Sequence, residues 1–170
     1  MLRNSLAIKT WRIIAFIALL LETSCAPAGS VLKVEPAAST IQVNDTVTVP
    51  IKIEDISNLT ALEFHLSFDA AILEVVEMKD GSFIKADFSI QNTFDNTAGT
   101  IDYAVAQINR EPATGNGILL EIIFRAKASG TSPIVFRETP AVPTGAIMSD
   151  SNGMALQVSL INGSVKVEAP

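Results

Sequence analysis

The segment that decides the fold is Ala61-Leu62-Glu63-Phe64-His65-Leu66-Ser67-Phe68-Asp69. Its apolar side chains, Leu62, Phe64, Leu66 and Phe68, alternate with the polar side chains of Glu63, His65 and Ser67. Successive side chains of a strand point to opposite faces, so a period of two predicts a strand with one dry face and one wet face. We expect the dry face to form the centre of the core. The wet face is the surface on which to look for a function.

The chain after residue 28 reads as further short strands separated by turns. Alternation and β-branched runs predict strands over 30–36, 40–43, 46–53, 73–78, 100–106, 118–126, 132–138, 155–160 and 164–167, with a short strand near 88–92. Residues 54–60, 107–117 and 139–150 are expected to be loops, and Asn162-Gly163 is expected to join the last two strands as a hairpin. This pattern predicts an all-β, antiparallel β-sandwich with a jelly-roll topology of about nine strands.

Residues 1–28 have the pattern of an export signal. A basic segment with Arg3, Lys9 and Arg12 precedes the apolar run 13–21, and Ala26-Pro27-Ala28 offers a cleavage site between small residues. The apolar run is too short to span a bilayer, which takes about 20 helical residues. We therefore expect a folded domain over residues 29–170 in a secreted or cell-surface protein.

Cys25 is the only cysteine, and it lies just after the apolar run. This position suggests a lipoprotein in which Cys25 carries a lipid, whereas Glu22 stands where a lipobox has an aliphatic residue. The alternative is secretion without a lipid. The protein would contact a membrane only through the lipid on Cys25. In both cases residues 29–170 contain no cysteine, so the domain forms no internal disulfide.

The composition is acidic. The chain has a net charge of −6, and removal of residues 1–28 takes away three basic side chains and one acidic side chain, which leaves −8. An acidic surface disfavours nucleic acid and anionic lipid as partners. The remaining length is enough for one domain of ordinary size, but not for two.

The sequence contains no set of residues with catalytic or metal-binding spacing. His65 is the only histidine, no Gly-x-Ser-x-Gly motif is present, and Asp150-Ser151-Asn152-Gly153 lacks the later oxygen ligands of a calcium loop. We interpret the last segment as a turn and expect His65 to be a solvated side chain on the wet face. The expectation is a protein that is not an enzyme and needs no cofactor.

Four segments together resemble the cohesin family, whose members are receptor modules for dockerin modules in bacterial cellulosome-type assemblies. The segments are VTVPI at 47–51, LEFHLSFDAAILEV at 62–75, GILLEIIFRA at 117–126 and LINGSV at 160–165. The resemblance extends from about Leu32 to Val167. It implies a jelly-roll sandwich, a non-catalytic module, a dockerin-like partner bound through one sheet face, and a link to polysaccharide degradation.

The resemblance also implies which side chains meet the partner. The family strand that matches residues 61–69 often carries an acidic residue and an amide. Glu63 takes the acidic position, whereas Ala61 stands where the amide is expected, which implies a different partner specificity. The partner-binding set is expected to be Ala61, Glu63, His65, Asp102, Ala104 and Ala106, joined by Leu119, Glu121 and Ile123 if Leu120, Ile122 and Phe124 point inward. Leu119 and Ile123 would then form a small exposed apolar patch, as at protein interfaces.

Two other functions stay open. A carbohydrate-binding module can share the jelly-roll form, but such modules stack sugar rings on exposed Trp or Tyr side chains. The only Trp, Trp11, lies in the signal, and the only Tyr, Tyr103, alternates with Ile101 and Val105 and is expected to point inward. Polysaccharide could still bind through a polar site. The third function is a self-associating adhesion domain of the cell envelope.

Overall fold

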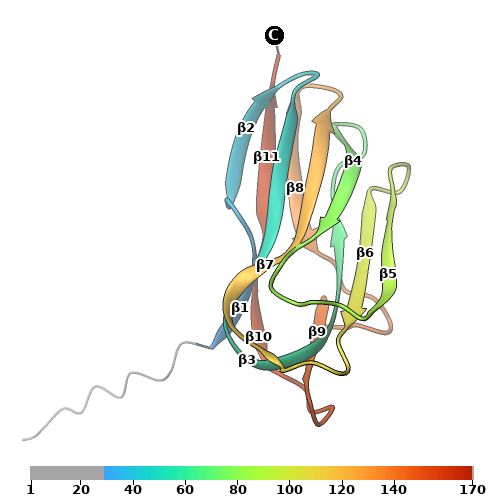
Figure 1. The fold of residues 1–170 in the computed structure, drawn as a ribbon. Helices are drawn as coiled ribbons and strands as arrows, with labels where there is room; N and C mark the ends of the chain where they lie inside the picture. Colours follow the sequence, from blue (N-terminus) through green and yellow to red (C-terminus); the bar gives the residue numbers. More distant parts are fainter. Residues whose placement is uncertain (1–28, 170) are drawn as a thin grey trace, which may run out of the picture.

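The computed structural model describes residues 29–169, and within this range the chain forms strands and turns but no helix. The strands are β1 (Ser30–Val34), β2 (Ala38–Gln42), β3 (Thr46–Ser67), β4 (Leu73–Asp80), β5 (Phe88–Asp95), β6 (Thr100–Ala106), β7 (Ala113–Ala126), β8 (Gly130–Phe136), β9 (Ala146–Asp150), β10 (Val158–Ile161) and β11 (Gly163–Glu168). They build a jelly-roll β-sandwich (Figure 1), which confirms the predicted fold class. The signal and Cys25 lie outside the described residues. In residues 29–169, nothing forms a helix that is long and apolar enough to cross a membrane.

Strand β3 belongs to both layers of the sandwich. Its first part, residues 46–56, lies between β7 and β1, whereas its last part, from Leu59 to Ser67, pairs with β6 on one side and with β9 and β8 on the other. Figure 1 shows the strand running down one side of the molecule, curving round the lower end and rising on the other side. The predicted loop over 54–60 is therefore wrong, because this segment stays within the strand.

The curve in β3 depends on two residues in the left-handed backbone region. Asp55 has a φ of 53° and Asn58 a φ of 63°. Aspartate and asparagine adopt this region more readily than other side-chain-bearing residues. The pairing with β7 shifts register on both sides of Ile56, and such bulges bend a strand. The Asp55 N–H donates to Asn116 Oδ1 at 2.6 Å and the Asn58 N–H to Thr114 Oγ1 at 3.0 Å, so the bend leaves neither amide unpaired.

The first layer has the order β4–β7–β3–β1–β10, and the second has the order β5–β6–β3–β9. Beside the end of β3, the second layer continues through β8 to β11 and β2. The pairs β1–β10 and β2–β11 are parallel, and the other pairs are antiparallel. Residues 29–169 form eleven strands where about nine are predicted. The expected strands 46–53 and 61–69 are one strand, β3, and β9 lies in the expected loop 139–150.

The predicted hairpin at Asn162-Gly163 is wrong. Strand β10 pairs with β1, whereas β11 pairs with β2 and β8, so the dipeptide marks a passage between layers. Gly163 is not among the residues with positive φ, which a tight hairpin turn of this kind would require. A Cβ at Gly163 would lie 2.5 Å from Val34 Cγ1, so close packing against β1 explains the glycine.

The dry face of β3 lies at the centre of the core, as predicted. Phe64 and Leu66 are fully buried, and the Phe64 ring packs against Tyr103 at 5.2 Å and against Phe136 at 6.0 Å between centroids. Phe68 packs edge-on against Phe124 of β7 at 5.3 Å, which joins the two layers. Aromatic pairs of this geometry add to the stabilisation from area burial.

Tyr103 also connects the layers through its hydroxyl group. It points inward from β6, as predicted, and its Oη lies 3.0 Å from Asp80 Oδ1 of β4 and 3.2 Å from the Leu119 carbonyl oxygen of β7. Burial, together with the neighbouring Asp80 carboxylate, raises the pKa of Tyr103 well above its ordinary value. The chain's only tyrosine therefore serves the core and offers no exposed ring for stacking a sugar.

The predicted surface position of Leu119 is wrong. Ile51 pairs with Leu120 and Lys52 pairs with Ile118, so Leu119 is one extra residue on β7 at a β-bulge. The bulge interrupts the alternation, and Leu119 is fully buried together with Leu120.

We predict that Leu119→Ala lowers the free energy of unfolding by about 2–5 kcal/mol, because it removes buried methyl groups and leaves a cavity. Denaturant unfolding of the two proteins measures the difference. Ile161→Ala is the matched control, since Ile161 is 45% exposed and should lose little. Equal effects of the two substitutions would contradict the buried placement of Leu119.

We also predict that the tyrosine ionises only when the protein unfolds. A tyrosine in an unfolded chain loses its proton near a pH of about 10, whereas folded Tyr103 has a raised pKa. Above that pH the unfolded state binds fewer protons than the folded state, so stability falls as the pH rises further. Tyrosinate absorbance should appear together with the loss of β-sheet circular dichroism. Ionisation near the ordinary pKa in a protein that is still folded would contradict the buried hydroxyl.

Candidate functional site

The outer side of the second layer is the candidate site, and we call it the β3–β6 face. Here the register places Ala61 opposite Ala106, Glu63 opposite Ala104, and His65 opposite Asp102. Ala61, Glu63, Asp102 and Ala106 are partly exposed, whereas His65 and Ala104 point to the same side but are buried. The face is completed by Ile90 of β5 and by Ile147 and Ser149 of β9, which pair with or flank these positions.

The other three predicted residues do not lie on this face. They belong to β7, which pairs with β4 and with the first part of β3, in the opposite layer. Glu121 is opposite Pro50 and Lys79, and Ile123 is opposite Thr48 and Glu77. The exposed apolar patch of Leu119 and Ile123 therefore does not form. The alternation of apolar and polar residues indicates which side chains of a strand point the same way. It does not indicate to which layer of the sandwich the strand belongs.

His65 is not the solvated side chain that the sequence predicts. Its side chain is only 7% exposed, with Nδ1 2.6 Å from Asp102 Oδ1 and Nε2 3.0 Å from Glu63 Oε1. The imidazole ring lies between the two carboxylates, and each ring nitrogen faces one oxygen, Oε1 of Glu63 or Oδ1 of Asp102.

Arg137 extends this arrangement, although no pattern in the sequence indicates it. Its Nη2 lies 2.9 Å from Asp102 Oδ1, and its backbone N–H donates to the His65 carbonyl oxygen at 2.8 Å. Its Nε is buried and has no acceptor among the described residues. Glu63, His65, Asp102 and Arg137 thus form one continuous row of polar contacts, which we call the charged row. Only three-dimensional pairing places Arg137, which follows β8, beside β6.

An apolar hollow of about 130 Å³ lies next to the charged row. Its lining residues are Ala61, Leu62, Glu63, Ile90, Ala104, Val105, Ile147 and Ser149. Ile90 is 70% exposed and Ile147 is 42% exposed, so both side chains border the hollow from the surface. Neither is a candidate from the sequence, because Ile147 falls in a predicted loop and Ile90 lies at a bulge in the pairing of β5 with β6.

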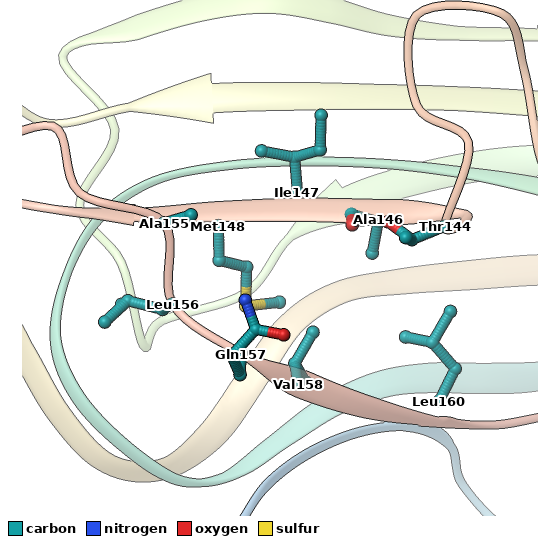
Figure 2. A pocket seen from close by; sticks show the side chains of 9 residues that line it. All are labelled: Thr144, Ala146, Ile147, Met148, Ala155, Leu156, Gln157, Val158 and Leu160. Carbon is teal, nitrogen blue, oxygen red and sulfur yellow. Dashed lines mark hydrogen bonds between the residues drawn. The ribbon is translucent and has the colours of Figure 1, made fainter.

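A second cavity, of about 140 Å³, lies between β9 and the segment 155–160 (Figure 2). Figure 2 shows Met148 pointing toward Gln157, whereas Ile147 points to the other side of β9. The lining contains no charged side chain, and the Thr144 hydroxyl donates to the Ala146 carbonyl oxygen at 2.8 Å. This cavity thus offers packing space but no evident chemistry.

Turns at the margin of the face carry anchored carboxylates. Asp150, at the end of β9, accepts hydrogen bonds from the backbone N–H groups of Met154 and Asn152, which lower its pKa. Asp87, just before β5, has a lowered pKa because the Ile108 N–H and the Arg110 side chain donate to it. Among residues 29–169, no three His, Cys, Asp or Glu side chains are grouped so that they could hold a metal ion.

An exposed apolar hollow beside a row of polar side chains is typical of the surface of a protein-interaction module. The family model of the cohesin domain matches residues 32–167, so the chain belongs to the cohesin family. Cohesins are non-catalytic modules that act through protein–protein contact.

Two curated proteins are similar in sequence. Cellulose-binding protein A of Clostridium cellulovorans is 24% identical over 135 residues, which cover 77% of this chain and 7% of that protein. Cell surface glycoprotein 1 of Acetivibrio thermocellus is 32% identical over 129 residues, which cover 63% of this chain and 6% of that protein. The chain thus spans less than a tenth of the length of either relative.

Solved structures share the fold at low identity. A type I cohesin–dockerin complex from Clostridium thermocellum has a TM-score of 0.70 at 17% identity and covers 84% of this chain and 95% of the other. A type II cohesin from the cellulosome of Acetivibrio cellulolyticus gives 0.69 at 21% identity, with 81% and 95% covered. A non-cellulosomal cohesin from Archaeoglobus fulgidus gives 0.65 at 20% identity, with 83% and 92% covered.

We predict that His65→Ala lowers the free energy of unfolding by about 1–3 kcal/mol, because the Glu63 and Asp102 carboxylates lose the buried ring that both contact. Chemical denaturation measures the change. Ser67→Ala is the control on the same face of the same strand. If both substitutions have the same small effect, the charged row does not stabilise the fold.

Proposed function

We propose that this chain is an extracellular cohesin module that binds a dockerin-type partner through the β3–β6 face. Of the residues expected from the sequence, Ala61, Glu63, Asp102 and Ala106 are partly exposed and would contact the partner, whereas His65 and Ala104 are buried beneath them and would support the face. The observation that carries the proposal is the exposed apolar surface beside the charged row. The side chains of this face are ordered by the charged row, and Ile90 and Ile147 stay exposed beside it, uncovered by the described loops. An uncovered apolar patch with a polar rim is typical of a protein interface.

The comparisons support the type of partner. Several of the solved structures that share the fold are cohesins in complex with dockerins, including complexes from Clostridium thermocellum and from Acetivibrio cellulolyticus. They resemble this chain at low identity, so the identity of its own partner is part of the proposal.

The proposal extends to location and pathway. The export-signal pattern of residues 1–28 and the relative named cell surface glycoprotein 1 support a place outside the cytoplasm. The relative named cellulose-binding protein A supports a link to polysaccharide degradation, with the partner rather than this chain as the catalytic component.

We predict that a panel of recombinant dockerin modules contains at least one that binds this chain with a Kd of about 1 μM or tighter. Glu63→Gln should raise that Kd about tenfold, because a carboxylate that accepts from the partner is replaced by a weaker acceptor. Titration calorimetry measures both values.

Glu121→Gln is the matched control, since Glu121 lies on the opposite layer. It should bind as the unchanged chain does. If no dockerin of the panel binds this chain at micromolar concentration, the proposed partner is contradicted. If Glu63→Gln and Glu121→Gln weaken binding equally, the proposed face is contradicted.

A further inference from the structure

The second layer ends at β5 (Phe88–Asp95), whose outer backbone edge has no neighbouring strand. Among residues 29–169, β5 pairs only with β6, and Figure 1 shows it at the margin of the molecule. We propose that this edge pairs with the same edge of a second copy of the chain, so that the second layers of two copies join into one sheet. This inference goes beyond the proposed function, because it concerns self-association and needs no dockerin.

The first observation is that β5 buries none of its side chains. All eight residues are exposed, and three of them, Phe88, Ile90 and Phe94, are large and apolar. The register places Phe88 opposite Ala106, on the outer side of the layer, and Phe94 opposite the buried Ile101, on the inner side. Both sides of the strand therefore present apolar surface along an edge whose backbone groups are open to a further strand.

The second observation is that the edge strand of the other layer, β4, is protected. The Val75 N–H donates to Asn96 Oδ1 at 2.7 Å, and Asn96 Nδ2 donates to the Val75 carbonyl oxygen at 2.9 Å. A side-chain amide thus occupies the place of a neighbouring strand. The pairing of β4 with β7 also has a bulge between Val75 and Glu77, and Glu77 forms an ion pair with Lys79. Bulges, lysines and covered backbone groups are means by which proteins prevent edge pairing.

Strand β5 lacks most of this protection. Its sequence, FSIQNTFD, contains no lysine, arginine, proline or glycine, and its single charged residue, Asp95, stands at the end. A bulge interrupts the pairing with β6 between Ser89 and Gln91, but residues 91–95 pair with β6 without a register shift. Segments of low charge without proline are those that pair most readily at an exposed edge. Residues 91–95 are therefore the segment that can accept a further strand.

The residues of this segment are complementary to those of a second copy in the antiparallel orientation. The chain has a net charge of −6, so two copies repel each other over much of their surfaces, whereas residues 88–94 carry no charge. A parallel pair would place the two Asp95 carboxylates side by side. An antiparallel pair centred on Thr93 separates them by four residues, about 13–14 Å, which exceeds the screening length of about 8 Å at physiological salt. Each Asp95 then lies opposite Gln91 of the other copy, whose side-chain amide can donate to it.

The same register brings two aromatic side chains together on the inner side of the sheet. Phe94 of each copy becomes a diagonal neighbour of Phe94 of the other copy. Diagonal neighbours on paired strands are about 7–8 Å apart, a distance that aromatic side chains can bridge. A second copy therefore covers a phenylalanine that is exposed in the single chain.

The joined sheet would present two partner sites on one surface. A two-fold axis that relates antiparallel strands of one sheet is perpendicular to the sheet, so the β3–β6 faces of both copies point to the same side. An edge contact of five residues buries less area than the roughly 1,200–2,000 Å² of a stable interface. We therefore expect a reversible dimer with a Kd of about 10–100 μM.

Sedimentation equilibrium of the full chain at about 1 to 300 μM measures the self-association. The unchanged chain should pass from monomer to dimer over this range. Thr93→Lys should raise the dimer Kd about tenfold or more, because two lysines would face each other at the two-fold axis. Val76→Lys is the matched control, since Val76 is exposed on β4 and the net charge changes equally. It should leave the dimer intact, and circular dichroism shows that both variants are folded.

Disulfide cross-linking tests the register. Cys25→Ser removes the only native cysteine. In that background, Thr93→Cys should give a disulfide-linked dimer on mild oxidation, because directly opposed Cα atoms of an antiparallel pair lie about 4.5–5.5 Å apart, within the range of disulfides. Gln91→Cys is the control on the same side of β5. It should not cross-link, because its counterpart in the other copy lies four residues further along the strand.

Three outcomes would overturn the proposal. The first is a chain that stays monomeric up to about 300 μM. The second is a dimer that Thr93→Lys does not weaken, or that Val76→Lys weakens as much. The third is cross-linking through Gln91→Cys in preference to Thr93→Cys. No dockerin takes part in these measurements, so their failure leaves the proposed function as it stands, and a failure to bind dockerins leaves the dimer as it stands.

Discussion

The bend in β3 is the constraint on which the rest of the structure depends. One strand supplies the centre of the first layer with residues 46–56 and the centre of the second with residues 59–67, so the layers cannot shift independently. The bend needs two residues with positive φ, and Asp55 and Asn58 meet this need with their amides bound to side chains of β7. The alternation of buried and exposed side chains resumes after the bend, and this places Glu63 and His65 on the outside of the second layer.

Once that face is in place, its character follows from neighbours that are distant in sequence. Asp102 comes from β6, Arg137 follows β8, and Ile147 comes from β9, yet all three lie beside the last part of β3. The result is a surface with an ordered polar part and an apolar part. In the polar part, each member of the charged row contacts the next. The apolar part has its depth because the residues beneath it are alanines. Pre-organised polar groups and a concave apolar area are the features from which protein interfaces derive specificity.

The sequence predicts this architecture as far as local signals extend. The alternation of Leu62, Phe64 and Leu66 correctly identifies the core strand, and Tyr103 is correctly placed inside. The environment of His65 could not be predicted, because its partners are reached through cross-strand register and a period of two gives only direction. The prediction for Leu119 is wrong because one extra residue at a bulge reverses the pattern locally. The prediction for Gly163 is wrong because a glycine required for close packing against Val34 looks, in sequence, like a glycine required for a turn.

The parallel pairing of the first and last strands also has a mechanical consequence. Ser30 to Lys33 lie beside Val158 to Ile161, and residues 38–42 lie beside 164–168, all running in the same direction. Tension applied between the start of β1 and the end of β11 pulls these partners in opposite directions along their length. The hydrogen bonds of both ladders then carry the load in shear and must break together, whereas an antiparallel terminal pair would open one bond at a time. A domain connected in this way is suited to transmitting force between whatever is attached at its two ends.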